Sequence, residues 1–162
     1  MKKVIIMLGA VLFFTACSTD NENDGGLEAS TLVGTWNMTD VRFPDDPNDT
    51  SLNLADEIVD QLVQENCFLV SFTFNADGSV SSEDKVNFIE VNSGPMGLDV
   101  PCPDNSTVET AEWVLEGNQL TLTGANQEET ITIELDGNTL IIAGEEINAQ
   151  NYAGAEAVFT KQ

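Results

Sequence analysis

The residues best suited to chemistry in this chain are its cysteines and its carboxylates. There are three cysteines, Cys17, Cys67 and Cys102, and no histidine. Serine or cysteine catalysis that relies on histidine, and any histidine-ligated metal, are therefore excluded. The 28 Asp and Glu residues include neighbouring pairs such as Asp45-Asp46 and Glu128-Glu129, but none stands in a pattern typical of an active site. The sequence predicts a protein that is not an enzyme and that uses neither a cofactor nor a metal.

Cys17 stands where an export signal would end. Two lysines precede an apolar stretch, Val4 to Phe14, which is too short to span a bilayer and which ends in small residues. Phe14-Thr15-Ala16-Cys17 resembles the lipobox of bacterial lipoproteins. The resemblance implies that residues 1–16 are a cleaved signal peptide and that Cys17 carries the lipid. Ordinary secretion, with Cys17 as a free thiol, is the alternative.

The charge of the mature chain restricts its partners. Cleavage would remove two of the five basic residues and no acidic one, which leaves Arg42, Lys85 and Lys161 against 28 acidic groups, a net charge of −25. Such a charge repels nucleic acid and anionic membrane surfaces, so we expect no nucleic-acid partner and membrane contact only through the lipid. The lipoprotein resemblance implies an outer-membrane protein on the periplasmic or the cell-surface face, where a protein partner is also conceivable.

Cys67 and Cys102 remain once Cys17 is assigned to the lipid, and they are an even number in an oxidising compartment. We expect them to form a disulfide. Closing a loop of about 35 residues would restrict the unfolded chain by about 3 to 4 kcal/mol. Metal binding is the competing use, but two cysteines without histidine do not complete a tetrahedral zinc site.

Residues 17–31 are predicted to be a flexible acidic tether, because they are mostly polar and offer little to bury. The tether also resembles the acidic surface-export signals of Bacteroidetes lipoproteins, and a plain acidic linker explains it equally well. Residues 32–162 are predicted to be one β-rich domain.

Alternation of apolar and polar residues predicts the strands of this domain. The stretch Thr35–Phe43 changes parity after Met38, which predicts a β-bulge near Thr39 or Asp40. Phe68, Val70, Phe72 and Phe74 give the clearest alternation, and Asp77-Gly78 predicts a type I′ turn after them. Further strands are expected at 79–91, 109–116, 119–124, 129–135, 139–143 and 152–161, with a long loop over 92–107.

Eight strands joined mostly to their sequence neighbours predict an all-β fold, an antiparallel up-and-down barrel. One short amphipathic helix is expected between the first two strands, from Asn53, its N-cap, to Asn66. Leu54, Ile58 and Leu62, together with Val59 and Val63, form its apolar stripe. At the mouth of a barrel this helix can be a lid that opens for ligand or a plug that does not.

Gly34-Thr35-Trp36 at the start of the first strand resembles the G-x-W signature of lipocalins. Together with Cys67, the phenylalanine-rich strand and Trp113 before a Gly-Asn turn, it is similar to the lipocalin-like lipoprotein domains of Bacteroidetes. The resemblance implies that Trp36 closes one end of the barrel. No arginine lies near the last strand to pack over Trp36, and Lys161 is expected to be a poor replacement.

Two functions remain open. The first is a carrier whose inward side chains, including Phe68, Val70, Phe72 and Phe74, line a cavity for a small apolar or amphipathic ligand. The second is a filled barrel that acts as a structural or interaction module of a cell-surface complex. The two differ in interior volume, which depends on whether large side chains from opposite walls meet.

Overall fold

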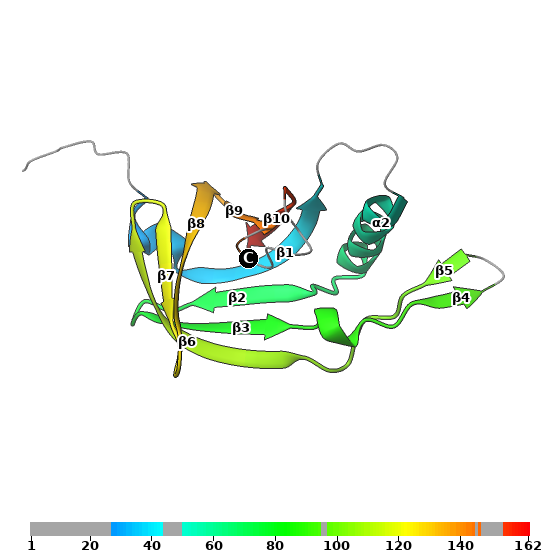
Figure 1. Cartoon of the computed structure of the whole chain (residues 1–162), viewed down its shortest axis with the longest axis horizontal. Helices are drawn as coiled ribbons and strands as arrows, with labels where there is room; N and C mark the ends of the chain where they lie inside the picture. The colour runs from blue at the N-terminus through cyan, green and yellow to red at the C-terminus, as the bar shows by residue number, and fades with distance from the viewer. Residues whose placement is uncertain (1–26, 44–49, 95–96, 145, 147–153) are drawn as a thin grey trace, which may run out of the picture.

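The computed structural model describes residues 27–43, 50–94, 97–144, 146 and 154–162 (Figure 1). Eight antiparallel strands form a closed barrel in the order β1-β10-β9-β8-β7-β6-β3-β2. They are β1 (Gly34–Arg42), β2 (Val70–Phe74), β3 (Ser79–Asp84), β6 (Thr107–Glu116), β7 (Gln119–Thr123), β8 (Glu128–Asp136), β9 (Thr139–Ala143) and β10 (Glu156–Lys161). Each pairs with its sequence neighbour in the barrel, and β1 pairs with β10 to close it. The predicted up-and-down barrel is confirmed.

The predicted bulge in the first strand is also confirmed. Met38 pairs with Phe159 and Asp40 with Val158, so Thr39 is the extra residue on β1. Its hydroxyl lies 2.8 Å from the Thr160 hydroxyl, which satisfies the looped-out side chain. The bulge returns Val41 to the inner face of the barrel, because side chains alternate faces along a strand.

The region after β3 differs from its prediction as a long strand and a loop. The carboxylate of Asp84 accepts a hydrogen bond from the backbone N–H of Val86, at 2.7 Å. This contact turns the chain into a 3-10 helix, η1 (Val86–Phe88), so the strand does not continue to residue 91. The predicted loop contains a two-stranded hairpin, β4 (Asn92–Gly94) and β5 (Gly97–Asp99), which projects to the right of the barrel in Figure 1.

The turn between β2 and β3 is not of type I′. That type requires positive φ at both central residues, and in this turn only Gly78 has a positive φ, of 86°. The backbone N–H of Gly78 donates to the carbonyl of Asn75, and the N–H of Asn75 donates to the carbonyl of Ser79. The Asp77 carboxylate accepts bonds from the Ser79 backbone and hydroxyl, which makes the longer turn stable.

Two helices accompany the barrel. The short α1 (Ala29–Leu32) begins inside the segment predicted as tether, so an ordered turn occupies the last residues of that segment. Residues 17–26 lie outside the described part of the chain. The predicted helix between strands is confirmed as α2 (Thr50–Gln64), and it begins three residues before the expected cap, Asn53.

The end of α2 has a clear physical cause. Asn66 has a φ of 58°, the left-handed conformation that asparagine tolerates better than most residues. The N–H of Asn66 donates to the carbonyl of Val63, and the N–H of Cys67 donates to that of Leu62. These two bonds form a Schellman motif. Leu62 and Cys67 are both buried in the core, so the end of α2 is fixed against the barrel.

The described residues contain no helix that is both long enough and apolar enough to cross a membrane.

Candidate functional site

The two ends of the barrel follow from the strand order. The turns at 117–118 and 137–138 lie at the end where β1 begins, and α1 lies there too. At the other end β1 finishes at Arg42, opposite Glu156 at the start of β10. Helix α2 lies at this second end, on the right of Figure 1, where it packs on β1. We call the first end the closed end and the second the open end.

Trp36 fills the closed end. Its side chain is completely buried, and its indole N–H donates to the carbonyl of Leu32 at 2.7 Å. This hydrogen bond ties the first strand to the last residue of α1, which lies across the closed end. A buried indole N–H needs such a partner.

Lys161 covers Trp36, at the place where the lipocalin resemblance leads us to expect an arginine. Trp36 and Lys161 are paired residues on β1 and β10, so the register places both on the same face. The Lys161 Nζ lies 5.3 Å from the centre of the indole ring and donates to the carbonyl of Thr31 at 2.8 Å. A cation over an indole face is attracted by the ring quadrupole.

Gly34 makes this arrangement possible. Its φ is 137°, and a Cβ at this position would lie 2.7 Å from the Cε of Lys161. Only glycine therefore fits between the start of β1 and the lysine side chain. The glycine and the tryptophan of the G-x-W triplet have separate structural tasks at one end of the barrel.

The apolar side chains on the inner face of the barrel are buried near the closed end and half-buried further along three of its strands. Because Cα partners in neighbouring strands share a face, the register identifies the inward residues. On β6, Leu115 and Trp113 are buried and Ala111 is half-buried; on β7, Leu120 is buried and Leu122 is half-buried. On β2, Phe74 is buried, whereas Phe72 and Val70 are half-buried.

We call the buried part of the inner face the floor, and the half-buried part beyond it the cup. The floor is aromatic: the rings of Phe74 and Trp113 meet edge to face with centres 5.4 Å apart. Above them, the ring centre of Phe72 lies 5.2 Å from that of Phe159. The indole N–H of Trp113 is bonded to the carbonyls of Asn75 and Ser79. No buried polar side chain lies among the described residues. The cup therefore offers apolar surface on β2, β6 and β7 beyond a packed floor.

The four residues predicted to line the cavity have different positions. Phe74 is part of the floor, and Phe72 and Val70 lie above it on the inner face of β2. Phe68 precedes the strand, which begins at Val70, and is half-buried. The fully buried residue in this segment is its neighbour Leu69, because the chain bends before β2 and the alternation is interrupted.

The three residues predicted to form the lid also differ. Leu62 is completely buried and Ile58 is half-buried against the core, whereas Leu54 is 37% exposed. Val59, which belongs to the predicted stripe, is buried. The helix is thus packed firmly at its C-terminal end and loosely near Leu54.

The disulfide between Cys67 and Cys102 is present, with Cα atoms 5.8 Å apart. It joins the residue that follows α2 to the chain that leads from β5 to β6. Val100, two residues before Cys102, is buried in the same core. The bond therefore links the end of the helix to the hairpin side of the open end.

Negative charges on α2 and β1 affect the ionisation of one carboxyl group, Asp56. Burial raises the pKa of the Asp56 carboxyl above its usual value of 3.8, and the negative charges of Asp60 and Asp40 raise it further. Arg42, at the end of β1, pairs with Asp40, at 3.3 Å, and with Glu156, at 3.8 Å. The negative charges on α2 and β1 therefore repel each other at neutral pH.

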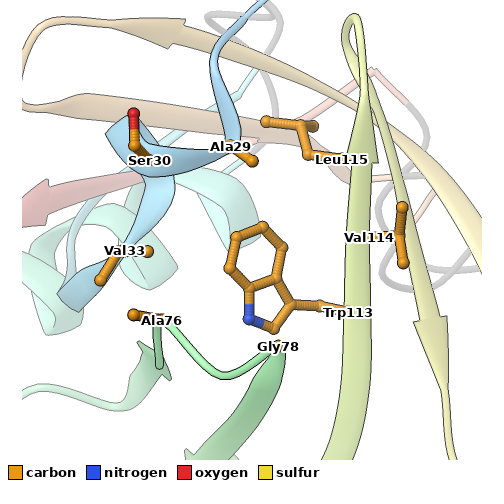
Figure 2. A pocket seen from close by; sticks show the side chains of 8 residues that line it. All are labelled: Ala29, Ser30, Val33, Ala76, Gly78, Trp113, Val114 and Leu115. Atoms are coloured by element: carbon orange, nitrogen blue, oxygen red, sulfur yellow. The ribbon is translucent and has the colours of Figure 1, made fainter.

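A separate groove lies at the closed end (Figure 2). Its volume is about 410 Å³, and it is formed between α1, the turn after β2 and the last part of β6. It is lined by Ala29, Ser30, Val33, Ala76, Gly78, Trp113, Val114 and Leu115. Ser30 supplies the only side-chain polar group apart from the Trp113 N–H, which is already bonded. The groove therefore has no group for chemistry and little for orienting a ligand.

The chain is similar to one known protein family and to two solved structures. The lipocalin-like domain family matches residues 32–142. A solved lipocalin-like protein from Bacteroides uniformis is 14% identical, with a TM-score of 0.41, and the match covers 82% of this chain and 99% of the other. An uncharacterized protein from Bacteroides eggerthii is 13% identical, also with a TM-score of 0.41, over 80% and 98% of the two chains. No curated protein matches the chain.

A closed eight-stranded meander whose floor is sealed by a tryptophan defines a lipocalin-like barrel. The family match covers more than half of the chain. The chain belongs to the lipocalin-like domain family.

Proposed function

We propose that this protein is a lipid-anchored binding protein that holds a small apolar or amphipathic ligand in the open half of its barrel. The observation that carries the proposal is the gradient of burial on the inner face. Phe72, Ala111 and Leu122 face the interior and remain half-buried, although every inward residue nearer the floor on the same strands is buried. Apolar surface left accessible inside a concave site is typical of ligand pockets.

The filled-barrel module is supported less well by this observation. A filled interior would bury inward side chains along the whole length of the strands, as it does near Leu120 and Phe74. On β9 and β10 the inward residues Ile142 and Ala157 are buried near the open end as well. The accessible surface is therefore confined to the β2, β6 and β7 side.

Filling the cup tests the proposal. Ala111→Trp should place a large side chain in the open half and weaken binding of the neutral fluorescent probe N-phenyl-1-naphthylamine at least about tenfold, because the ring occupies the ligand volume. Thr110→Trp is the matched control, since Thr110 is exposed on the same strand and faces outward. If both variants bind the probe equally, or if the unaltered protein does not bind it, the ligand-carrier hypothesis is wrong and the filled-barrel module is favoured.

The anchor is the second part of the proposal. It rests on the short apolar stretch that ends at Cys17, and it places the protein at the outer membrane, on its periplasmic or cell-surface face. Cys17→Ser should abolish labelling by an alkyne analogue of palmitate and release the protein from membranes. A variant that is labelled and membrane-bound like the unaltered protein would contradict lipidation at this residue.

A further inference from the structure

Ser82 places a hydroxyl group on the inner face of the cup. It lies on β3, where it pairs with Phe72 of β2, and Cα partners in neighbouring strands share a face. Phe72 faces the interior, since its ring centre lies 5.2 Å from that of Phe159. Ser82 therefore faces the interior as well, beside an apolar ring.

The Ser82 hydroxyl is available to a ligand. None of the described residues makes a hydrogen bond to it, and no buried polar side-chain atom in the described part of the chain lacks a partner. Ser82 is half-buried, so an unbonded hydroxyl on it must be accessible from the cup. On the outer face of the next strand pair, by contrast, the hydroxyls of Thr35 and Thr73 lie 3.2 Å apart.

The three basic side chains after residue 16 are all engaged elsewhere. Arg42 pairs with two carboxylates, one on β1 and one on β10. Lys85 pairs with Glu83, at 3.8 Å, and Glu83 faces outward because it is the neighbour of an inward residue on β3. Lys161 lies over Trp36 at the closed end. No basic side chain is therefore left to neutralise an acid in the cup.

An acidic head group is disfavoured at this place. Moving a carboxylate or a phosphate out of water costs free energy unless a cation or several hydrogen bonds compensate it. Glu109, the partner of Ser82 on β6, is an exposed carboxylate that adds a weak repulsion for an anion. It does not make a site for a cation, because solvent screens a single exposed charge. The cup therefore favours an uncharged head group.

We infer that the ligand of the proposed cup is an uncharged lipid with a hydroxyl head group, which bonds to Ser82 while its alkyl body lies over Phe72 and Ala111. The inference rests on the proposed function. A hydroxyl group both donates and accepts hydrogen bonds, so it pairs with the Ser82 hydroxyl in either sense. A fatty acid of the same chain length is excluded, because its carboxylate would lack a counterion.

Three probes with the same ten-carbon chain test the inference: 1-decanol, decanoate and decyltrimethylammonium. Each is titrated at about pH 7, where decanoate is ionised, against protein loaded with N-phenyl-1-naphthylamine. We expect 1-decanol to displace the fluorescent probe at a concentration at least about tenfold lower than decanoate does, because only decanoate carries a charge without a partner. The quaternary ammonium donates no hydrogen bond and should also be weaker than 1-decanol.

A pair of variants locates the head group. Ser82→Ala should raise the concentration of 1-decanol needed for displacement about three- to tenfold, the effect of one neutral hydrogen bond. Its affinity for N-phenyl-1-naphthylamine, which has no hydroxyl group, should change less than about twofold. Ser81→Ala is the matched control, because Ser81 is half-buried on the outer face of the same strand. Equal effects of the two variants on 1-decanol, or no effect of Ser82→Ala, would overturn the inference.

The outcomes separate this inference from the proposed function. If N-phenyl-1-naphthylamine binds and decanoate or decyltrimethylammonium displaces it as well as 1-decanol does, the cup binds ligand and the uncharged head group is wrong. If the fluorescent probe does not bind and Ser82→Ala changes nothing, both the cup and the head group are wrong.

Discussion

Lys161 stabilises the closed end of the barrel with a single ammonium group that makes two contacts. It lies over the ring of Trp36 and donates to the carbonyl of Thr31. Removing a cation–π contact and a hydrogen bond costs about 1 kcal/mol or slightly more. We expect Lys161→Met to lower the free energy of unfolding by that amount in urea denaturation. Lys161→Arg should keep most of the stability, and an unchanged Lys161→Met variant would contradict this role.

Asp56 should make stability depend on pH. Burial raises the pKa of its carboxyl, with the charges of Asp60 and Asp40 adding to the shift. A carboxyl group whose pKa is raised by folding destabilises the folded state when it is ionised. This loss of stability vanishes below pH 3.8, because the group is then protonated in both the folded and the unfolded state. Asp56→Asn should therefore raise the melting temperature at about pH 7 and leave it unchanged at about pH 3.

Glu57, the residue that follows Asp56 on α2, provides the control for the Asp56 variant. Glu57→Gln removes one negative charge from the same helix. If it raised the melting temperature at neutral pH as much as Asp56→Asn does, the gain would come from the total charge, and the local repulsion between α2 and β1 would be refuted.

At the scale of the element, α2 is the predicted lid, and its two ends are packed differently against the barrel. Its C-terminal end is fixed by Leu62 and the disulfide, whereas Leu54 is exposed. A lid must open more easily than the wall. We expect the amides of Ala55–Val63 to exchange hydrogen faster than those of Phe68–Phe74, and N-phenyl-1-naphthylamine to slow them. Equal protection in both segments with no effect of the probe would identify a plug.

The disulfide between Cys67 and Cys102 should stabilise α2 as well as the whole domain. It closes a loop of 35 residues, and loops of that size stabilise the folded state by about 3 to 4 kcal/mol when bridged. Replacing both Cys67 and Cys102 with alanine should lower the melting temperature and speed exchange in α2 more than in β7 or β8. A melting temperature equal to that of the unaltered protein would contradict a stabilising role.

The elements that could be predicted from sequence are those determined by patterns of residues close together in the chain. The bulge at Thr39 follows from a change of parity, and the strand at Phe72 and Phe74 follows from strict alternation. The end of β3 was missed because it depends on one hydrogen bond from the Val86 N–H to the Asp84 side chain, which no periodicity reveals. The β4–β5 hairpin was missed because its residues are exposed on both strands and so do not alternate.

At the scale of the whole molecule, the candidate site depends on closure of the barrel. Alternation predicts that Phe72 and Phe74 share a face, but it does not predict that Phe74 is covered and Phe72 is not. Phe74 is covered because the ring of Trp113, from β6, meets it edge to face. The position of Lys161 over Trp36 likewise requires the pairing of the first and last strands, which are more than one hundred residues apart in the sequence.

The central claim is that ligand occupies the open half of the barrel above a solid floor. Nuclear Overhauser effects between a bound alkyl probe, 1-decanol, and the methyl groups of labelled protein test it directly. We predict contacts from the probe to the methyls of Val70, Ala111 and Leu122, and none to those of Leu120 and Ile133 in the filled half. Contacts only to the exposed, outward methyls of Val108 or Val114, or no contacts at all, would contradict the account.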